Sequence, residues 1–456
     1  MAGDRREAGG RREAHNRLTA ITGGAHDCGT AITGGGARLR HRDHGTWGRP
    51  APAGAGVTLD QMSPDPFAPA HLGPIRLRNR IIKSATFEGR APGGLVSQEL
   101  IDFHTEVGRG GVGMTTVAYL AVSPEGRTHA DQVWWRPEAL PGLARLTAAV
   151  HETGALVSAQ IGHAGPVANA AANGLPSLAP SIRFNPLAMR PDRPATTADL
   201  RRIIDAHGQA AAWAREVGFD AVEVHLGHNY LASAFLSPRV NRRRDAWGGS
   251  LARRAEFPRR ILAAVREQAG DSVAVLAKLN MADGVRGGFD LAESIPFAQM
   301  LEADGHVDAL VLTGGSSLLN PMYLFRGDAP VREFAATQPP LLRLGLRLVG
   351  RAFLKAYPYR PLYFLEYARQ FRAALSLPLV LLGGVTDRTG IDTAMREGFE
   401  FVAMARALLR EPDLVERIRT DPTTTSRCIH CNRCMPTIYT TTHCPVARES
   451  QPDPRP

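Results

Sequence analysis

The 456-residue sequence has no uninterrupted apolar run of the roughly 18 residues that a bilayer-spanning helix needs. Its first twenty residues, MAGDRREAGGRREAHNRLTA, also lack the apolar stretch of a secretory signal. Cysteine is scarce, with five in the chain and four of those in the last thirty residues, which does not make a disulfide framework for a chain this long. We therefore expect no membrane span, a cytoplasmic location, and either reduced thiols or a metal site.

Lysine is nearly absent. Of the 54 basic residues only Lys83, Lys278 and Lys355 are lysine, and the excess over 44 acidic residues gives a formal charge of +10. A basic protein can bind nucleic acid, but the sequence carries no helix-turn-helix, zinc-finger or RNA-binding sheet signature. The abundance of arginine together with alanine indicates a coding bias rather than a basic patch, so we expect no nucleic-acid partner.

The domain organisation follows from composition and periodicity. The chain is 44% hydrophobic and 21% charged, which is typical of a globular protein with a large core. Residues 1–61 are rich in Gly, Ala and Arg and show neither helical nor strand periodicity, so they are predicted to form a disordered or dispensable arm. A folded body is predicted over 62–425, and a cysteine-bearing segment over 426–456.

The folded body alternates short apolar runs, typical of strands, with helical patterns such as Thr197–Val217 and Ser250–Ala269. Eight such units, with no GxGxxG after the first strand, favour a closed (β/α)8 TIM barrel over an open doubly wound sheet. The predicted strands are Ile81–Thr86, Gly113–Ala118, Ala155–Gln160, Ala221–His225, Val273–Leu279, Ala309–Thr313, Leu379–Leu382 and Phe401–Ala405.

A long insertion, residues 314–363, separates the sixth and seventh predicted strands and exceeds an ordinary connection. It is rich in aromatic and basic residues, and two short helices are predicted within it. A lid or wall over the substrate is one interpretation; padding of the barrel or a subunit contact is the other.

In a barrel of this kind, chemistry gathers at the carboxyl ends of the strands. The fourth strand delivers His225 there, with His228 and Tyr230 close behind. Imidazole N–H groups can donate to a carbonyl oxygen, and a phenol can donate a proton. A metal site is the competing interpretation, disfavoured because no carboxylate or third histidine stands nearby in the sequence, and a purely structural histidine pair is another.

Other strand ends carry further polar groups. Gln160 ends the third strand, and its amide suits the edge of a heteroaromatic ring. Lys278 lies within an apolar run, where an ammonium needs an anion or acceptor unless it reaches solvent. Gly383, Gly384 and the Ala405–Arg406 turn follow the last two strands, a frequent phosphate site in such barrels. The implied ligand carries a phosphate and a ring.

Six motifs occur in a fixed order: LRNRIIKSAT, QIGHAG, GFDAVEVHLGHNYLASAFLSP with NRRRDAWGGS, AKLN, GGV and MARALL. With them, the chain from about Pro66 to Val446 resembles the old yellow enzyme group of flavin-dependent oxidoreductases. The resemblance is to the branch that includes NADH:flavin oxidoreductases and 2,4-dienoyl-CoA reductase-like proteins.

The resemblance implies a non-covalent FMN and NAD(P)H as the electron donor. Ser84, Ala85 and Thr86 would pass beside the flavin ring, Gln160 and Lys278 would contact its edge, and Gly384 and Arg406 with neighbouring amides would hold its phosphate.

The implied reaction is a ping-pong reduction of the C=C bond of an α,β-unsaturated carbonyl compound. His225 and His228 would bind the carbonyl oxygen, and Tyr230 would protonate the α-carbon. The alternatives are an enoyl- or dienoyl-CoA-type reductase, a demethylase-like flavoenzyme fed by a partner protein, and a non-enzymatic nucleic-acid or metal-binding protein. The physiological substrate, the choice between NADH and NADPH, and homo-oligomer formation are left open.

Cys428, Cys431, Cys434 and Cys444 are spaced C-x2-C-x2-C-x9-C. Four thiolates so close can hold a [4Fe–4S] cluster or zinc. Iron–sulfur relatives usually have one more residue between the second and third cysteines, a longer final gap, and nucleotide-binding domains after the barrel. A cluster, zinc and free thiols therefore all remain open.

Overall fold

The computed structural model describes residues 63–185, 190–338 and 340–449. Eight parallel strands close into a barrel, in the order β10-β11-β12-β13-β3-β4-β5-β9. The predicted (β/α)8 architecture is confirmed, while the predicted arm, residues 1–61, lies outside the described residues. The strands are β3 (Ile81–Lys83), β4 (Met114–Ala121), β5 (Leu156–Gly162), β9 (Ala221–Leu226), β10 (Ala274–Asn280), β11 (Ala309–Thr313), β12 (Leu379–Leu382) and β13 (Phe401–Met404).

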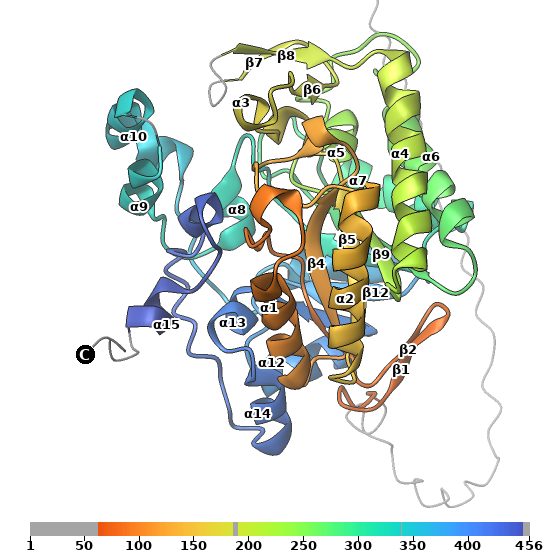
Figure 1. Ribbon diagram of the computed structural model, residues 1–456, viewed down its shortest axis with the longest axis vertical. Helices are drawn as coiled ribbons and strands as arrows, with labels where there is room; N and C mark the ends of the chain where they lie inside the picture. The colour runs from red at the N-terminus through yellow and green to blue at the C-terminus, as the bar shows by residue number, and fades with distance from the viewer. Residues whose placement is uncertain (1–62, 186–189, 339, 450–456) are drawn as a thin grey trace, which may run out of the picture. The chain divides into compact units, whose positions relative to one another are not determined.

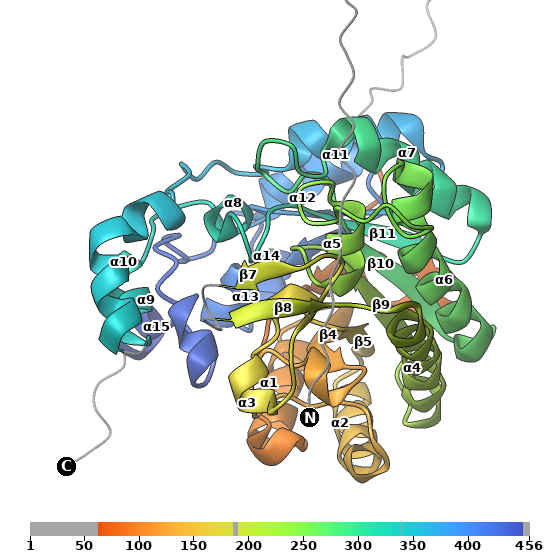
Figure 2. The same cartoon turned by 90° about the horizontal axis from the view of Figure 1, so that it is seen from above.

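Helices surround the barrel (Figures 1 and 2). The longest, α4, starts at a capping box in which the side chains of Thr196 and Asp199 bond each other's backbone N–H groups. The surrounding helices are α1 (Gln98–Arg109), α2 (Leu140–His151), α4 (Thr197–Glu216), α6 (Leu251–Ala269), α7 (Leu291–Asp304), α11 (Leu365–Ala374), α12 (Arg388–Arg396), α13 (Arg406–Arg410) and α14 (Leu414–Thr420).

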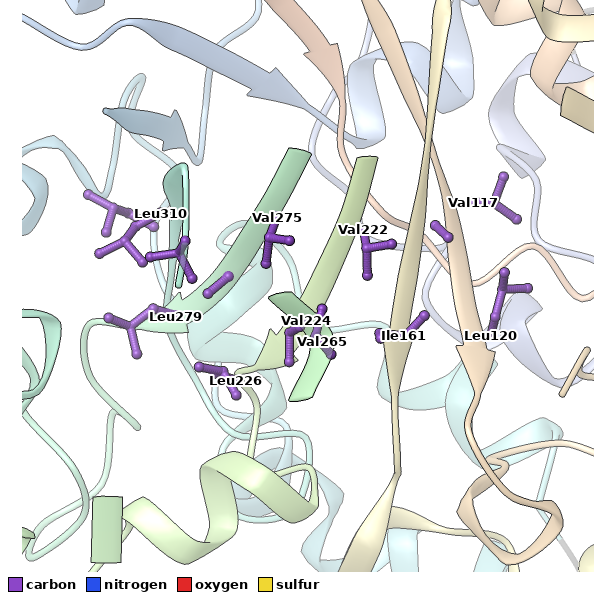
Figure 3. Close-up of a cluster of buried hydrophobic side chains, with 14 of the residues drawn as sticks. Val117, Leu120, Ile161, Val222, Val224, Leu226, Val265, Val275, Leu279 and Leu310 are labelled. Atoms are coloured by element: carbon purple, nitrogen blue, oxygen red, sulfur yellow. The ribbon is translucent and has the colours of Figure 1, made fainter. Parts of the chain in front are cut away.

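The main core lies between the strands and this helical layer. Figure 3 shows Val222 and Val224 of β9 with Val275 of β10 and Val265 of α6, all fully buried. A second cluster fills the amino-terminal end of the barrel, where the β1–β2 hairpin (Ala70–Leu72 and Ile75–Leu77) packs against the strands. Because parallel strands are buried on both faces, the few polar side chains within them mark the site.

A small three-stranded sheet was not predicted. It contains β6 (Leu178–Ala179), β7 (Arg183–Asn185) and β8 (Arg190–Pro194), strands too short to give a periodic signal. With α3 (Ala170–Asn173) and α5 (Leu231–Leu236), it lies at the end of the molecule opposite the β1–β2 hairpin (Figure 1).

The insertion contains three helices, α8 (Pro321–Phe325), α9 (Val331–Ala336) and α10 (Pro340–Phe353), so the prediction of two was wrong. It packs against the cysteine-bearing segment, which includes the short α15 (Pro445–Glu449). Met322 and Met435 share one apolar cluster, and the rings of Tyr359 and His430 stack with their centroids 3.4 Å apart. No helix in the described part of the chain is long and apolar enough to cross a membrane.

Candidate functional site

The carboxyl end of β9 brings the three predicted catalytic side chains together. The ring of His225 lies 4.9 Å from that of His228 and 4.5 Å from that of Tyr230, measured between centroids. His225 is only 5% exposed. The strand and the turn after it thus gather two imidazoles and a phenol at one point.

The turn is held in an uncommon backbone conformation. His228 and Asn229 have φ values of 63° and 57°, in the left-handed region that costs a non-glycine residue about 1–2 kcal/mol. The His228 N–H donates to Asn280 Oδ1 at 3.1 Å, and its Nε2 lies 3.1 Å from Thr313 Oγ1. These bonds from β10 and β11 fix the orientation of the imidazole.

Both imidazoles are neutral at physiological pH. Burial, with the nearby positive charge of Lys278, lowers the pKa of His228 to about 3. Burial, His228 and Lys278 together hold the pKa of His225 well below its usual range. Nδ1 of His225 is buried without a hydrogen-bond partner. Such an unpaired group is costly unless a ligand satisfies it.

Lys278 stands beside the histidines because it pairs in register with His225 across β9 and β10. Its Nζ donates to Glu223 Oε1 at 2.8 Å and to Ser84 Oγ at 3.2 Å. Gln160 Nε2 donates to the same carboxylate oxygen at 2.6 Å. The structure therefore joins Lys278 and Gln160 through one buried acid, and Lys278 in turn joins Ser84 to them.

The expectation that no carboxylate stands near the histidines was wrong: Glu223 was missed by the sequence analysis, although a signal existed. It lies two residues before His225, so both side chains point to the same face of β9. A carboxylate at that place in an apolar strand needs a cation, and Lys278 on the next strand provides one.

Tyr119 on β4 was also missed. Its ring lies 5.2 Å from the Tyr230 ring and 6.5 Å from the His225 ring, between centroids. Its hydroxyl donates to Gly126 O at 2.6 Å, and burial raises its pKa well above the usual value. Tyr119 is thus a fixed, protonated side chain beside the histidine pair, packed with Tyr230 and Ala85 in one apolar cluster.

Ser84, Ala85 and Thr86 follow β3 directly, and the Ser84 N–H donates to Met404 O at 2.7 Å. A second buried network anchors the far end of this segment, where Glu88 lies 3.4 Å from Lys83 Nζ and 3.3 Å from His104 Nε2.

The loop after β12 requires glycine. Gly383 and Gly384 have φ values of 109° and 83°, and a Cβ on Gly384 would lie 2.8 Å from the backbone nitrogen of Leu362. Arg406 follows Ala405 at the start of α13, and its Nη1 donates to Arg326 O at 2.9 Å. Nε of Arg326 is buried without a partner.

The four cysteines are free and line one small pocket with Arg406 and Arg410. Burial raises the pKa of the Cys428 thiol, and it raises the pKa of the Cys434 thiol to about 12. Within residues 63–185, 190–338 and 340–449, no group of three or more His, Cys, Asp or Glu side chains is placed to hold a metal ion.

Comparison with known proteins gives the family. A 4,4'-dithiodibutanoate disulfide reductase of Rhodococcus erythropolis is 57% identical over 384 residues, covering 84% of this chain and 95% of that protein. A metal reductase of Desulforamulus reducens is 30% identical over 376 residues, covering 82% of this chain but only 52% of that longer protein.

Among solved structures, the old yellow enzyme homologue from Zymomonas mobilis has the same fold, with a TM-score of 0.63, 21% identity, and coverage of 85% of this chain and 99% of that one. Residues 65–314 match the sequence profile of a flavin enzyme family. The chain belongs to the NADH:flavin oxidoreductase / NADH oxidase family, which confirms the resemblance to old yellow enzymes.

Proposed function

We propose that this oxidoreductase binds FMN, takes electrons from NAD(P)H and reduces the C=C bond of an α,β-unsaturated carbonyl compound beside His225, His228 and Tyr230. The observation that carries the proposal is a pair of neutral imidazoles, one with an unpaired buried nitrogen, that lies next to a phenol. FMN, when bound, supplies the hydride chemistry.

The donor set suits that cofactor. Lys278, Gln160 and Ser84 lie together at the strand ends, and Lys278 has a third N–H beyond the two that bond Glu223 and Ser84. Lys278 and Gln160 would bind the ring edge, while Ser84, Ala85 and Thr86 would pass beside the ring.

Gly383, Gly384, Ala405 and Arg406 would hold the phosphate. Support comes from the guanidinium groups of Arg406 and Arg326, whose charges both reach the hydroxyl of Tyr363, and Arg326 retains an unpaired buried nitrogen.

The protein's own groups would then do three things. The imidazoles of His225 and His228 would donate to the substrate carbonyl oxygen and stabilise the charge that develops there. Tyr230 would give its proton to the α-carbon. Tyr119, kept protonated by burial, would hold the ring of Tyr230 in place.

A second candidate is the reduction of an organic disulfide, favoured by the 57% identity to the Rhodococcus enzyme named for that reaction. One NAD(P)H and one proton would convert RSSR into two RSH. Two electrons break the S–S bond, and each sulfur takes one proton. Tyr230 would here protonate a departing thiolate.

An anaerobic experiment tests both candidates. The protein is supplied with FMN, reduced with NADH or NADPH, and then mixed with 2-cyclohexenone or 4,4'-dithiodibutanoate while flavin absorbance is followed. The compound that reoxidises the reduced flavin is the acceptor. If neither NADH nor NADPH reduces the flavin, the electrons come from a partner protein. Failure to bind FMN would refute the proposal.

The double variant His225→Ala, His228→Ala should retain FMN and lose about 100-fold or more of enone reduction, as when oxyanion donors are removed elsewhere. The matched control is His71→Ala, an exposed histidine on the β1–β2 hairpin at the other end of the barrel. Unchanged enone turnover in the double variant would refute the assigned role.

For Cys428, Cys431, Cys434 and Cys444 we propose a [4Fe–4S] cluster. The four thiols line one pocket, and a cluster of this kind is held by four Cys thiolates. Arg406 and Arg410 would offset the negative charge. Metal analysis of anaerobically purified protein decides among four irons, one zinc and free thiols.

A further inference from the structure

A cavity of about 510 Å³ opens among the loops that follow β9, β10 and β11. Its wall consists of Arg239, Val285, Arg286, Gly287 and Leu319. Two guanidinium groups and no carboxylate thus line it. Its volume is within the range of a site for a small organic molecule.

The loop from β11 ties this cavity to the histidine pair. Ser317 N–H donates to His228 O at 3.0 Å. Three residues on, Asn320 Nδ2 donates to Gly284 O at 2.7 Å, beside the cavity wall. The same short loop therefore supports the His228 backbone and borders the cavity.

The cavity wall carries positive charge. Arg239 and Arg286 are exposed, and neither makes a hydrogen bond or ion pair with any residue that the structure describes. Arg183, on β7, is close enough to Arg239 for their charges to repel. Asp192 on β8 is the carboxylate whose charge reaches Arg183.

Arg183 adds an independent observation. Its Nη1 is buried and has no hydrogen-bond partner. A buried guanidinium donor left unpaired near the charge of Arg239 is unfavourable in the free protein. An anion bound at Arg239 would offset the repulsion between these two charges.

We propose that this cavity is a subsite for a carboxylate group of the substrate, bound by Arg239 and Arg286. The inference rests on the proposed function for the reducible bond, which lies at His225 and His228. The substrate class is a carboxylic acid that also carries a disulfide or a C=C bond. A planar guanidinium binds a carboxylate through two parallel hydrogen bonds, which fixes the substrate's direction.

The test measures binding to the full-length, FMN-supplemented protein by calorimetry, without NAD(P)H. The probes are 4,4'-dithiodibutanoate and its neutral diamide. Arg239→Gln and Arg286→Gln should each weaken diacid binding about tenfold, the loss expected for one charged hydrogen-bonded contact. Binding of the diamide should not change.

Arg244→Gln is the matched control, because Arg244 is exposed in the same region and does not line the cavity. It removes the same charge from the protein and should leave both affinities unchanged. Equal wild-type affinity for diacid and diamide would overturn the proposal. So would a double variant, Arg239→Gln with Arg286→Gln, that still binds the diacid normally.

Failure of the subsite and failure of the proposed function give different results. If both probes are reduced equally well by the wild type and bind equally well, the function stands and the subsite is wrong. If neither disulfides nor enones are reduced, yet diacid binding depends on the two arginines, the subsite stands and the proposed function is wrong.

Discussion

Replacement of Glu223 by Gln tests how much the negative charge of Glu223 contributes to the stability of the protein. Glu223 is 3% exposed and Lys278 is 2% exposed, and their closest atoms lie 2.8 Å apart. At an effective dielectric constant of about 20, two unit charges at that distance attract by about 6 kcal/mol. Glutamine keeps the shape and one acceptor oxygen but leaves the Lys278 ammonium buried beside a neutral group. Breaking one side of a buried pair costs about 3–5 kcal/mol, so we expect Glu223→Gln to lose that much unfolding free energy.

The measurement is urea unfolding followed by tryptophan fluorescence and circular dichroism. The second variant, Glu223→Gln with Lys278→Met, removes both charges and should recover part of the loss. The control is Glu256→Gln in the exposed i,i+4 pair with Arg260 on α6, which should change stability by about 0.5 kcal/mol or less. If Glu223→Gln destabilises no more than this control, the buried carboxylate does not stabilise the site as argued.

Three further predictions address acid stability and the loops near the proposed phosphate site. His207 and His228 have pKa values lowered to about 4 and about 3. As the pH falls below about 6.5, these histidines take up protons in the unfolded chain before they do so in the folded protein, so the free energy of unfolding decreases. From pH 7 to pH 5 the loss should be about 4 kcal/mol for the two histidines together, measured by urea unfolding at each pH. Gly384→Ala, which places a Cβ 2.8 Å from backbone, should weaken FMN binding in a fluorescence titration, whereas Gly174→Ala, with a similar φ but open space around it, should not. Asn432→Ala should also weaken FMN binding, because Asn432 accepts a hydrogen bond from Arg406 and donates one to Arg326 O at 3.1 Å. If the variant binds FMN as tightly as the wild type, the cysteine-bearing segment does not contribute to the cofactor site.

The barrel could be predicted because its strands are short apolar runs separated by helical patterns. Polar residues that interrupt such runs stand out, as Lys278 does in β10. The structure places its ammonium 2.8 Å from Glu223, which satisfies the predicted need for an anion. The need for a partner was visible in the sequence, and the identity of the partner depended on the register of two strands.

Contacts between distant parts of the chain could not be predicted. Asn432 bonds the Arg326 carbonyl across 106 residues of sequence, and no local pattern encodes that pairing. The same reason explains why Tyr119 was missed: a tyrosine in a buried strand is ordinary, and only closure of the barrel places its ring 6.5 Å from His225. Sequence thus predicts the residues whose type conflicts with local burial, and tertiary structure adds those whose type is locally unremarkable.

The insertion and the cysteine-bearing segment bear on the cofactor site together. Asn432 is 1% exposed and lies between Arg406, at the start of α13, and the carbonyls of Arg326 and Asp328 in the insertion. Asn432 lies between Cys431 and Cys434 and lines the same pocket as the four cysteines. A group bound by these cysteines would therefore also restrain Arg406. The insertion holds the other side of this contact, so it supports the Arg406 end of the barrel mouth, while β6–β8 lie near α5 and the histidine pair. The two ends of the barrel mouth are thus built from different additions to the same eight-stranded frame.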